Sequence, residues 1–369
     1  MEIVRVALSN FLNYASAHVE FESGVNMVVG ENASGKTNIV DGVLFASIGR
    51  SSRHTKDKEL INWNSKNGAQ ITLKIQKKFS SHIIDIVIDS AGTKHVSIDD
   101  LPIKRIGELM GVLNVVFFSP SELALISGAP SDRRRFLNIS LSQQSRPYFY
   151  ALQNYNKLLV QRNNILKKYN ASDNIKDLLQ LTDPGLSHEA SIIIKERAKF
   201  IKKLALVSKE KHNILTGNKE DLDISYETCD LSFDNLEKSF GEALSNSFAR
   251  DIHTEYTNVG PHRDDLKISA NSTDLRRFGS QGQQRSAVLS MKLAEIELFK
   301  KRTQETPILI LDDVLSELDE FRRRALLSSI SGIQTLITCT EPSKEAEDPY
   351  ALFKVHNCSI SKYDSFYTV

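Results

Sequence analysis

Short segments rich in Val, Ile and Phe, with partial alternation of apolar and polar positions, dominate the first 118 residues of the chain. Alternation with a period of two places one face of a strand in a core, so this pattern predicts strands. They are expected over residues 3–8, 18–21, 25–29, 70–79, 82–88 and 115–118. One helix is expected to interrupt them, directly after Gly35.

The pattern becomes helical between residues 121 and 250. From Tyr148 to Tyr169 apolar side chains recur with a seven-residue rhythm, in which Arg162 is the one polar break. A second helix is expected after Asp183, because this residue can cap a helix whose first turn contains Pro184. Together the two helices predict a short antiparallel hairpin.

Strands and helices alternate again after His253. Strands are expected at residues 266–269, 308–311 and 335–338, and helices at 283–301 and 321–330. Such alternation is typical of α/β folds. We therefore expect three segments, which are an N-terminal α/β half (1–120), an inserted, mainly α-helical lobe (121–250) and a C-terminal α/β half (251–369).

Composition narrows the function classes. The 369 residues are 40% apolar and 25% charged, as in ordinary globular proteins. The formal net charge is +1, so any affinity for nucleic acid must come from local basic patches. The three cysteines show no CxxC spacing, which argues against a disulfide framework or a zinc site. With no long apolar run and no secretory pattern at the start, a cytoplasmic protein without membrane contacts is expected.

A glycine-rich loop carries the strongest chemical signal. Gly30 to Thr37 fits GxxxxGK[ST], and a strand precedes the loop while a helix follows it. In such a loop backbone N–H groups face phosphates, the lysine reaches the β- and γ-phosphates, and the threonine hydroxyl holds Mg²⁺. We expect bound ATP to contact Gly30, Glu31, Asn32, Ala33, Ser34, Gly35, Lys36, Thr37 and Asn38.

Two carboxylates follow the apolar run Ile308 to Leu311. A buried strand that ends in acids can present them beside the nucleotide. Asp312 is expected to hold Mg²⁺, and Asp313 to orient or deprotonate the attacking water. Together with Lys36, Asp313 is therefore a candidate catalytic residue.

A second anion-binding helix start is predicted at Ser280 to Arg285, before an amphipathic helix. One nucleotide does not need two such sites in one protomer. The economical interpretation is a composite site in a homodimer, in which Ser280, Gln281, Gly282 and Gln283 of one copy cap the nucleotide on the glycine-rich loop of the other.

The order of these motifs, with Ser316 to Asp319 after the two acids, resembles the Walker A, signature, Walker B and D-loop set of ABC-type ATPases. Five further segments, spread along nearly the whole chain, are Asn10 to Tyr14, Phe118 to Pro120, Arg133 to Leu137, Gln161 to Asn163 and Gly260 to Asp265. Together they resemble the RecF family of bacterial recombination mediators.

The resemblance implies an α/β, SMC-head-like ABC-type ATPase domain with a mixed sheet, a P-loop and an inserted helical lobe. It implies an ATP-induced dimer that binds single-stranded or gapped DNA, at duplex–single-strand junctions, and loads RecA with RecO and RecR. Recombinational repair, replication restart and SOS induction are the expected processes, and weak, DNA-stimulated ATP hydrolysis is the expected release step. On DNA the protein would be associated with the nucleoid.

The sequence departs from related patterns at three places. Leu12 stands where the RecF family usually has Arg. Thr338 to Thr340 lie where ABC transporter subunits place a switch histidine. Asp313 stands where those subunits have Glu, as it does in RecF proteins, and its shorter carboxylate predicts slow turnover.

Other features have competing interpretations. Arg50, Arg53 and Lys56 either contact DNA phosphates or form a solvated loop. His262 with Asp264 and Asp265 is more typical of a hydrogen-bonded loop than of a metal site. A match to the guanine-reading NKxD motif at residues 218–221 is attributed to chance, and Trp63 is expected in the core.

Two other function classes fit the sequence less well. An ABC transporter ATPase subunit would need a compact head without the long helical insertion. An SMC-type structural chromosome protein would need long arms, whereas the rhythmic segments here span only about 25 residues, or about 40 Å at 1.5 Å per residue.

Overall fold

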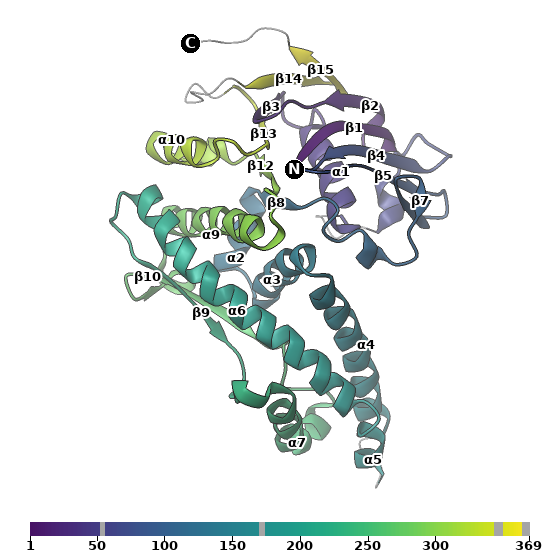
Figure 1. The fold of residues 1–369 in the computed structure, drawn as a ribbon, viewed down its shortest axis with the longest axis vertical. Coiled ribbons are helices and arrows are strands. Elements are labelled where there is room, and N and C mark those ends of the chain that lie inside the picture. Colours follow the sequence, from purple (N-terminus) through teal and green to yellow (C-terminus); the bar gives the residue numbers. More distant parts are fainter. Residues whose placement is uncertain (52–55, 170–173, 343–349, 364–369) are drawn as a thin grey trace. The chain divides into compact units, whose positions relative to one another are not determined.

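The computed structural model describes residues 1–51, 56–169, 174–342 and 350–363 (Figure 1). Contacts within the chain divide it into two compact units. Unit 1 contains Met1–Leu123, Glu210–Glu220 and Arg285–Val369, and unit 2 contains Ala124–Lys209 and Asp221–Gln284. This grouping differs from the expected boundaries at 121 and 251, because a strand after residue 251 pairs with one before it.

Unit 1 is built on two six-stranded sheets. The first is antiparallel, with the order β2-β1-β4-β5-β6-β7. Its strands are β1 (Glu2–Phe11), β2 (Tyr14–Glu20), β4 (Ala69–Gln76), β5 (Ser81–Ile88), β6 (Lys94–Ile98) and β7 (Leu101–Pro102). The alternating burial along β4 shows why the two-residue pattern predicted it.

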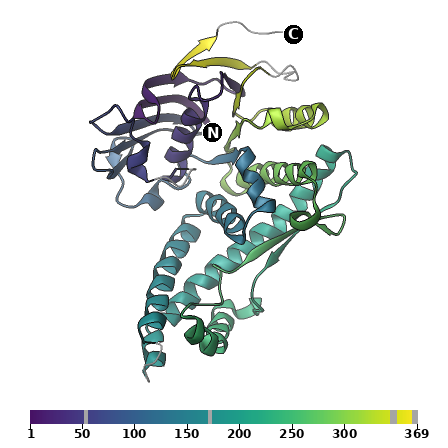
Figure 2. The ribbon, with the colours of Figure 1, turned by 180° about the vertical axis from the view of Figure 1, so that it is seen from behind.

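The second sheet of unit 1 has the order β15-β14-β3-β13-β12-β8, parallel except for the edge strand β15. Its strands are β3 (Val25–Val29), β8 (Val115–Phe118), β12 (Ile308–Asp312), β13 (Thr335–Cys339), β14 (Ala351–His356) and β15 (Ser359–Tyr363). In both views β15 lies at the edge of this sheet with β14 beside it, and β15 contacts β2 (Figures 1 and 2).

Helix α1 (Lys36–Ile48) contacts strands of both sheets. Its apolar side chains are buried all around the helix, as expected for a helix enclosed in a core. Unit 1 also contains α9 (Gln281–Thr303) from residue 285 onward, α10 (Glu320–Ser329), and the short helices η1 (Asp57–Leu60), η2 (Ile106–Glu108), η3 (Pro120–Leu123) and η5 (Leu315–Glu317).

Unit 2 combines helices with the three-stranded antiparallel sheet β11-β10-β9. Its strands are β9 (Leu222–Glu227), β10 (Asp265–Ala270) and β11 (Thr273–Asp274). Its helices are α2 (Ala124–Ser127), α3 (Pro130–Gln144), α4 (Arg146–Tyr169), α5 (Ile175–Leu179), α6 (Asp183–Thr216, which ends in unit 1), η4 (Phe233–Asn235), α7 (Leu236–Thr254) and α8 (Leu275–Phe278).

Helices α4 and α6 run antiparallel, because Tyr148 bonds Arg197 near one end of the pair and Arg162 bonds Asp183 near the other. Arg162 is fully buried. Its guanidinium donates to Asp183 at 2.8 Å and to Asp251 at 2.7 Å. The polar break in the apolar rhythm of α4 is therefore a buried ion cluster that connects three helices.

Two sequence predictions are wrong. The segment 222–227 is strand β9, although it lies in the block predicted to be helical; its partner β10 is about 40 residues further along, beyond the reach of a local pattern. Trp63 is not in the core, because 97% of its surface is exposed.

Candidate nucleotide-binding site

The glycine-rich loop, Gly30 to Thr37, called the P-loop below, joins the end of β3 to the start of α1, as predicted. A Cβ at Gly30 would lie 2.4 Å from the carbonyl oxygen of Val355 in β14, so only glycine fits there. Gly35 has a φ of 111°, and a Cβ would lie 2.9 Å from the Tyr14 hydroxyl. Tight packing therefore requires both glycines of the motif.

Lys36 folds back over this loop. Its ammonium donates to the carbonyl oxygens of Gly30 at 2.5 Å and Glu31 at 2.8 Å, and its side chain is buried. The first N–H groups of α1 are those of a helix start without a side-chain cap. A phosphate can accept hydrogen bonds from both the Lys36 ammonium and these helix N–H groups.

The first acid, Asp312, ends β12 and is buried. Its Oδ1 accepts hydrogen bonds from the Thr37 hydroxyl at 3.3 Å and the Thr338 hydroxyl at 2.6 Å. A threonine hydroxyl and a carboxylate are hard oxygen donors of the kind that Mg²⁺ prefers. The side chains of Thr37 and Asp312 therefore fit a magnesium site beside the loop.

The second acid, Asp313, adopts a left-handed backbone with φ of 56°. Its N–H donates to the carbonyl and hydroxyl oxygens of Thr338, and its carboxylate accepts from Ser316 at 3.3 Å. This geometry holds an exposed carboxylate next to the buried Asp312. Backbone strain of this kind is common at functional sites.

Three parts of the site escaped the sequence analysis. Thr338 positions both acids, Tyr14 donates its hydroxyl to the Gly35 carbonyl at 3.2 Å, and Cys358 donates its N–H to the Ser34 carbonyl at 3.1 Å. Burial raises the pKa of Tyr14, which keeps the phenol a donor. Tyr14 and Thr338 lie in strands and Cys358 in the turn between β14 and β15. All three reach the loop only through pairing within the sheets, so the local sequence did not predict these contacts.

The segment Ser280 to Arg285, called the signature loop below, lies at the start of α9, and its residues up to Gln284 belong to unit 2. The Ser280 N–H donates to the Gln283 side chain at 3.0 Å, and the Gln283 N–H donates to the Ser280 hydroxyl at 3.2 Å. This reciprocal pair is a capping box. A Cβ at Gly282 would meet nothing within 4 Å, so packing within the chain does not explain the glycine.

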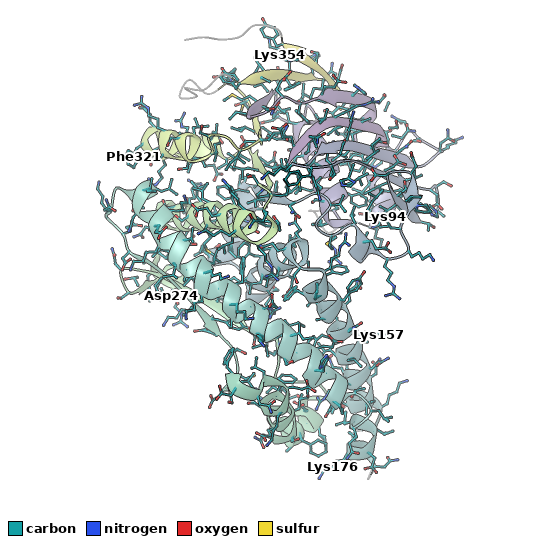
Figure 3. The ribbon with its side chains drawn as sticks, in the orientation of Figure 1. Lys94, Lys157, Lys176, Asp274, Phe321 and Lys354 are labelled. Atoms are coloured by element: carbon teal, nitrogen blue, oxygen red, sulfur yellow. The ribbon has the colours of Figure 1, made fainter. Side chains whose placement is uncertain are left out.

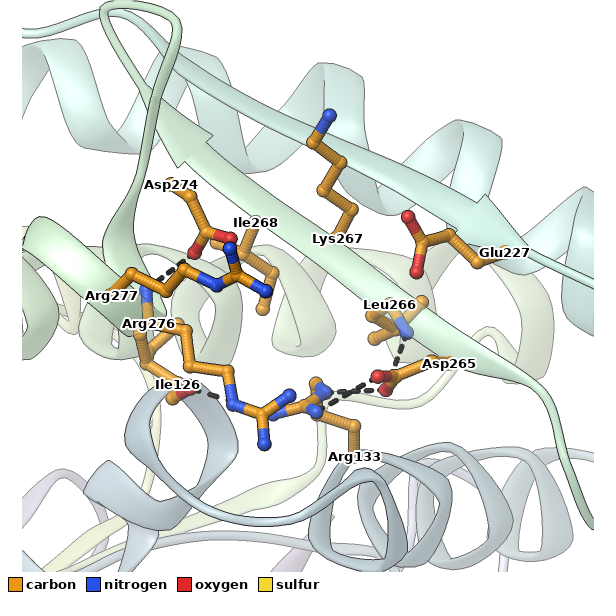
Figure 4. Close-up of a pocket in the computed structure, with 10 residues that line it drawn as sticks. All are labelled: Ile126, Arg133, Glu227, Asp265, Leu266, Lys267, Ile268, Asp274, Arg276 and Arg277. Atoms are coloured by element: carbon orange, nitrogen blue, oxygen red, sulfur yellow. Dashed lines mark hydrogen bonds and ion pairs between the residues drawn. The ribbon is translucent and has the colours of Figure 1, made fainter.

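Unit 2 holds a polar pocket of about 210 Å³ that the sequence did not indicate. Figure 4 shows Arg133 and Asp265 facing each other in it as a two-bond ion pair, with N–O distances of 2.5 and 2.9 Å. Arg276 and Arg277 from α8 also line it.

The motif Gly260 to Asp265 forms a hydrogen-bonded loop, as predicted. The His262 Nε2 donates to the Thr257 carbonyl at 3.0 Å, so Nδ1 accepts from the Tyr155 hydroxyl at 2.6 Å. Burial lowers the pKa of His262 to about 4. Asp264 bonds Tyr226 and Arg197. Within the described residues no group of three or more His, Cys, Asp or Glu could hold a metal.

The predicted DNA contacts are located only in part. Arg50 and Lys56 are exposed, while Arg53 lies outside the described residues. Residues 218–221 precede β9 instead of following a strand, which is not the guanine-reading arrangement. Over the described ranges no helix combines the length and apolar character that crossing a membrane requires.

Comparison with known proteins identifies the family. The family model of the RecF/RecN/SMC N-terminal domain matches residues 2–361. The DNA replication and repair protein RecF of Clostridium kluyveri is 44% identical over 98% of this chain and 100% of its own length. This chain belongs to the RecF family.

Solved structures agree with this RecF family assignment. The recombination mediator protein RecF with ATP, described as part of the RecFOR pathway, is 32% identical, with a TM-score of 0.90 over 98% of this chain and 97% of the other. An SMC head domain from Pyrococcus furiosus is 15% identical, with a TM-score of 0.56 over 98% and 95%, and shares the fold alone. The predicted ABC-type, SMC-head-like α/β fold is confirmed.

Proposed function

We propose that this RecF family member is an ATP-switched, DNA-binding recombination mediator. The observation that carries the proposal is the pairing of a P-loop with two acids of different environment, one buried against Thr37 and one exposed on a strained turn. In this arrangement the buried acid would help to hold the nucleotide through Mg²⁺, and the exposed acid would act in its hydrolysis. The solved relative named above was described with ATP and as a recombination mediator.

ATP phosphates would be held by the loop from Gly30 to Asn38, with the Lys36 ammonium turning from its two loop carbonyls to phosphate oxygens. Thr37 and Asp312 would hold Mg²⁺, which when bound offsets negative charge on the phosphate oxygens. Asp313 would orient or deprotonate the attacking water. Its carboxylate is one methylene shorter than Glu, which favours slow hydrolysis that acts as a timed switch.

The signature loop supports an ATP-induced homodimer. Ser280 and Gln283 hydrogen-bond each other and so fix the first turn of α9. The N-terminus of such a helix can bind an anion. The open space at Gly282 admits a second body close to the backbone. We infer that Ser280, Gln281, Gly282 and Gln283 contact the γ-phosphate held on the P-loop of the other protomer.

DNA would bind through local cations, because the net charge of +1 supplies no general attraction. Arg50 and Lys56 are exposed and suited to phosphate contacts, and two protomers would combine their patches. We infer single-stranded or gapped DNA as the ligand, RecO, RecR and RecA as partners, and weak DNA-stimulated hydrolysis as the release step. The protein would act in the cytoplasm, on the nucleoid when DNA is bound.

Analytical sedimentation tests this proposal. The full chain is run with ATP, with ADP and without nucleotide, each with and without gapped DNA. A dimer that forms only with ATP and that carries the DNA is the expected result. A monomer under all six conditions, or DNA binding of equal strength with ADP and ATP, would contradict the switch.

A further inference from the structure

Trp63 has an environment that neither the P-loop nor the signature loop explains. With 97% of its surface accessible, it is the most exposed large apolar side chain in the part of the chain that the structure describes. A soluble domain normally covers a tryptophan at least in part. An indole left in solvent therefore points to a ligand that covers it.

The turn under Trp63 is well bonded. Trp63 is the second residue of a β-turn that begins at Asn62, whose side-chain oxygen accepts the Asn64 N–H at 2.9 Å. Asn62 is tied to the end of β1, since its N–H donates to the Asn10 carbonyl at 2.8 Å and its side-chain amide to the Leu12 carbonyl at 2.7 Å. The hydrogen bonds of the turn thus hold the indole at the tip, outside the core.

The surroundings of Trp63 in the sequence are basic. Lys56 and Lys58 precede it, and Lys66 follows it in the same loop; all three are exposed. Of the two acids in this stretch, Asp57 is paired with Lys94 at 2.7 Å, and Glu59 is exposed. The remaining excess of positive charge suits a phosphate backbone.

We propose that Trp63 is the stacking platform for an unpaired base of single-stranded DNA, with Lys56, Lys58 and Lys66 contacting the neighbouring phosphates. An exposed aromatic ring flanked in the sequence by exposed cations suits the binding of single strands without reading of their sequence. In a duplex the base faces are covered by their neighbours, so the indole has no partner there. Trp63 therefore sets the preference for single-stranded over duplex DNA. This inference rests on the proposed function and adds the residue that recognises an unpaired base.

Trp63 is the only tryptophan of the chain, so its fluorescence reports on this surface directly. The full chain with ATP and Mg²⁺ is titrated with an oligothymidylate of about 20 nucleotides, longer than the site of a typical single-strand binding fold, and with a blunt duplex of equal length. Anisotropy of dye-labelled DNA in parallel samples measures the bound fraction. We expect the single strand to quench Trp63 in proportion to that fraction, and the duplex to leave its emission unchanged.

Variants measure how much the ring contributes. Trp63→Ala should weaken single-strand binding about tenfold, which is the usual loss when a ring that stacks on a base is removed. Duplex binding should stay within about twofold of the wild type. Trp63→Phe keeps a stacking face and should retain most of the preference. Phe233→Ala is the matched control, because Phe233 is also an exposed aromatic residue, at 53%, but its nearest charged neighbours in the sequence are the acids Asp230 and Asp234; both affinities should stay unchanged.

The outcomes separate this inference from the proposed function. Unchanged emission when single-stranded DNA is fully bound, or a wild-type ratio of the two affinities in Trp63→Ala, would overturn the stacking role while ATP-dependent DNA binding stands. Equal quenching by the duplex would also overturn it and would point to a wedge between paired bases. If no form of DNA binds the wild-type chain, the proposed function fails and the inference fails with it.

Discussion

At the scale of single residues, the two neighbouring acids have different environments. Asp312 is buried and accepts two threonine hydroxyls, whereas Asp313 is exposed on a left-handed turn. On this difference rests our proposal that Asp312 holds the metal and that Asp313 activates the water. Lys36 donates to two loop carbonyl oxygens, and we propose that its ammonium binds phosphate when ATP is present.

Asp313→Asn should retain ATP binding and lower hydrolysis by about 100-fold or more, as removal of a general base typically does. Lys36→Ala is the contrasting variant, because loss of the ammonium should weaken ATP binding itself by about tenfold or more. Equilibrium binding of a fluorescent ATP analogue and single-turnover hydrolysis separate the two effects. Equal hydrolysis by wild type and Asp313→Asn would remove Asp313 from its role.

Thr338→Val should impair hydrolysis without unfolding the protein. Valine keeps the shape but lacks the hydroxyl that donates to Asp312 at 2.6 Å and accepts the Asp313 N–H at 3.0 Å. We expect about a tenfold slower rate, in line with one lost charge-assisted hydrogen bond, and a higher Mg²⁺ requirement, with both restored in Thr338→Ser. A Mg²⁺ titration of the rate that is identical in Val and Ser variants would argue against this positioning role.

His262 should make unit 2 less stable in acid. Its pKa is about 4 in the folded protein and about 6.5 when unfolded, so between these values only the unfolded chain binds the proton. The contribution of neutral His262 to the free energy of unfolding is fully present above about pH 6.5. It falls by about 2–3 kcal/mol as the pH drops towards 4.

Burial raises the pKa of Asp264, which acts in the opposite direction, so the comparison must be made between wild type and His262→Gln. Urea unfolding followed by circular dichroism at a series of pH values measures it. The acid-side loss should be smaller in His262→Gln. Parallel pH profiles of the two proteins would exclude His262 as the cause.

At the scale of elements, one ion cluster connects α4, α6 and α7. Arg162 of α4 donates to Asp183 of α6 and to Asp251 of α7. Asp251 is fully buried and also accepts the Asn258 N–H at 3.0 Å. The negative charge of the buried Asp251 carboxylate is therefore balanced by the Arg162 guanidinium.

Arg162→Met should destabilise unit 2 by about 3–5 kcal/mol, because it leaves Asp251 as an uncompensated buried charge. Lys157→Met on the same helix is the control, since Lys157 extends into solvent and should change stability by less than about 0.5 kcal/mol (Figure 3). Thermal unfolding of the two variants tests the contrast. Equal unfolding midpoints would show that the cluster contributes no net stability.

At the scale of the whole molecule, hydrolysis is proposed to require two copies of the chain. Ser280→Arg should leave ATP binding by the monomer intact and abolish the ATP-induced dimer, because a long cation would obstruct the facing nucleotide. The specific activity of the wild type should rise with protein concentration between nanomolar and micromolar. A constant specific activity, together with a wild-type chain that stays monomeric with and without ATP, would refute the composite site.

Much of the protein could be predicted from local sequence. The P-loop, the two acids after an apolar strand and the signature loop at a helix start each lie within a few consecutive residues, so the order of side chains predicted where they lie. The α/β fold class followed from alternating strand and helix patterns for the same reason. A hydrogen-bonded loop at His262 was predictable because its acids lie within three residues.

Only the tertiary structure decided which distant residues complete these motifs. Thr338 reaches Asp312 because β13 pairs with β12, and Cys358 reaches the P-loop because β14 pairs with β3. Strand β9 was missed because its partner comes later in the chain, and Trp63 was misplaced because its turn is anchored to β1 by backbone hydrogen bonds. Hydrophobicity indicates whether a side chain favours burial. Pairing between strands far apart in the sequence fixes the backbone, and the backbone determines whether that side chain reaches the core.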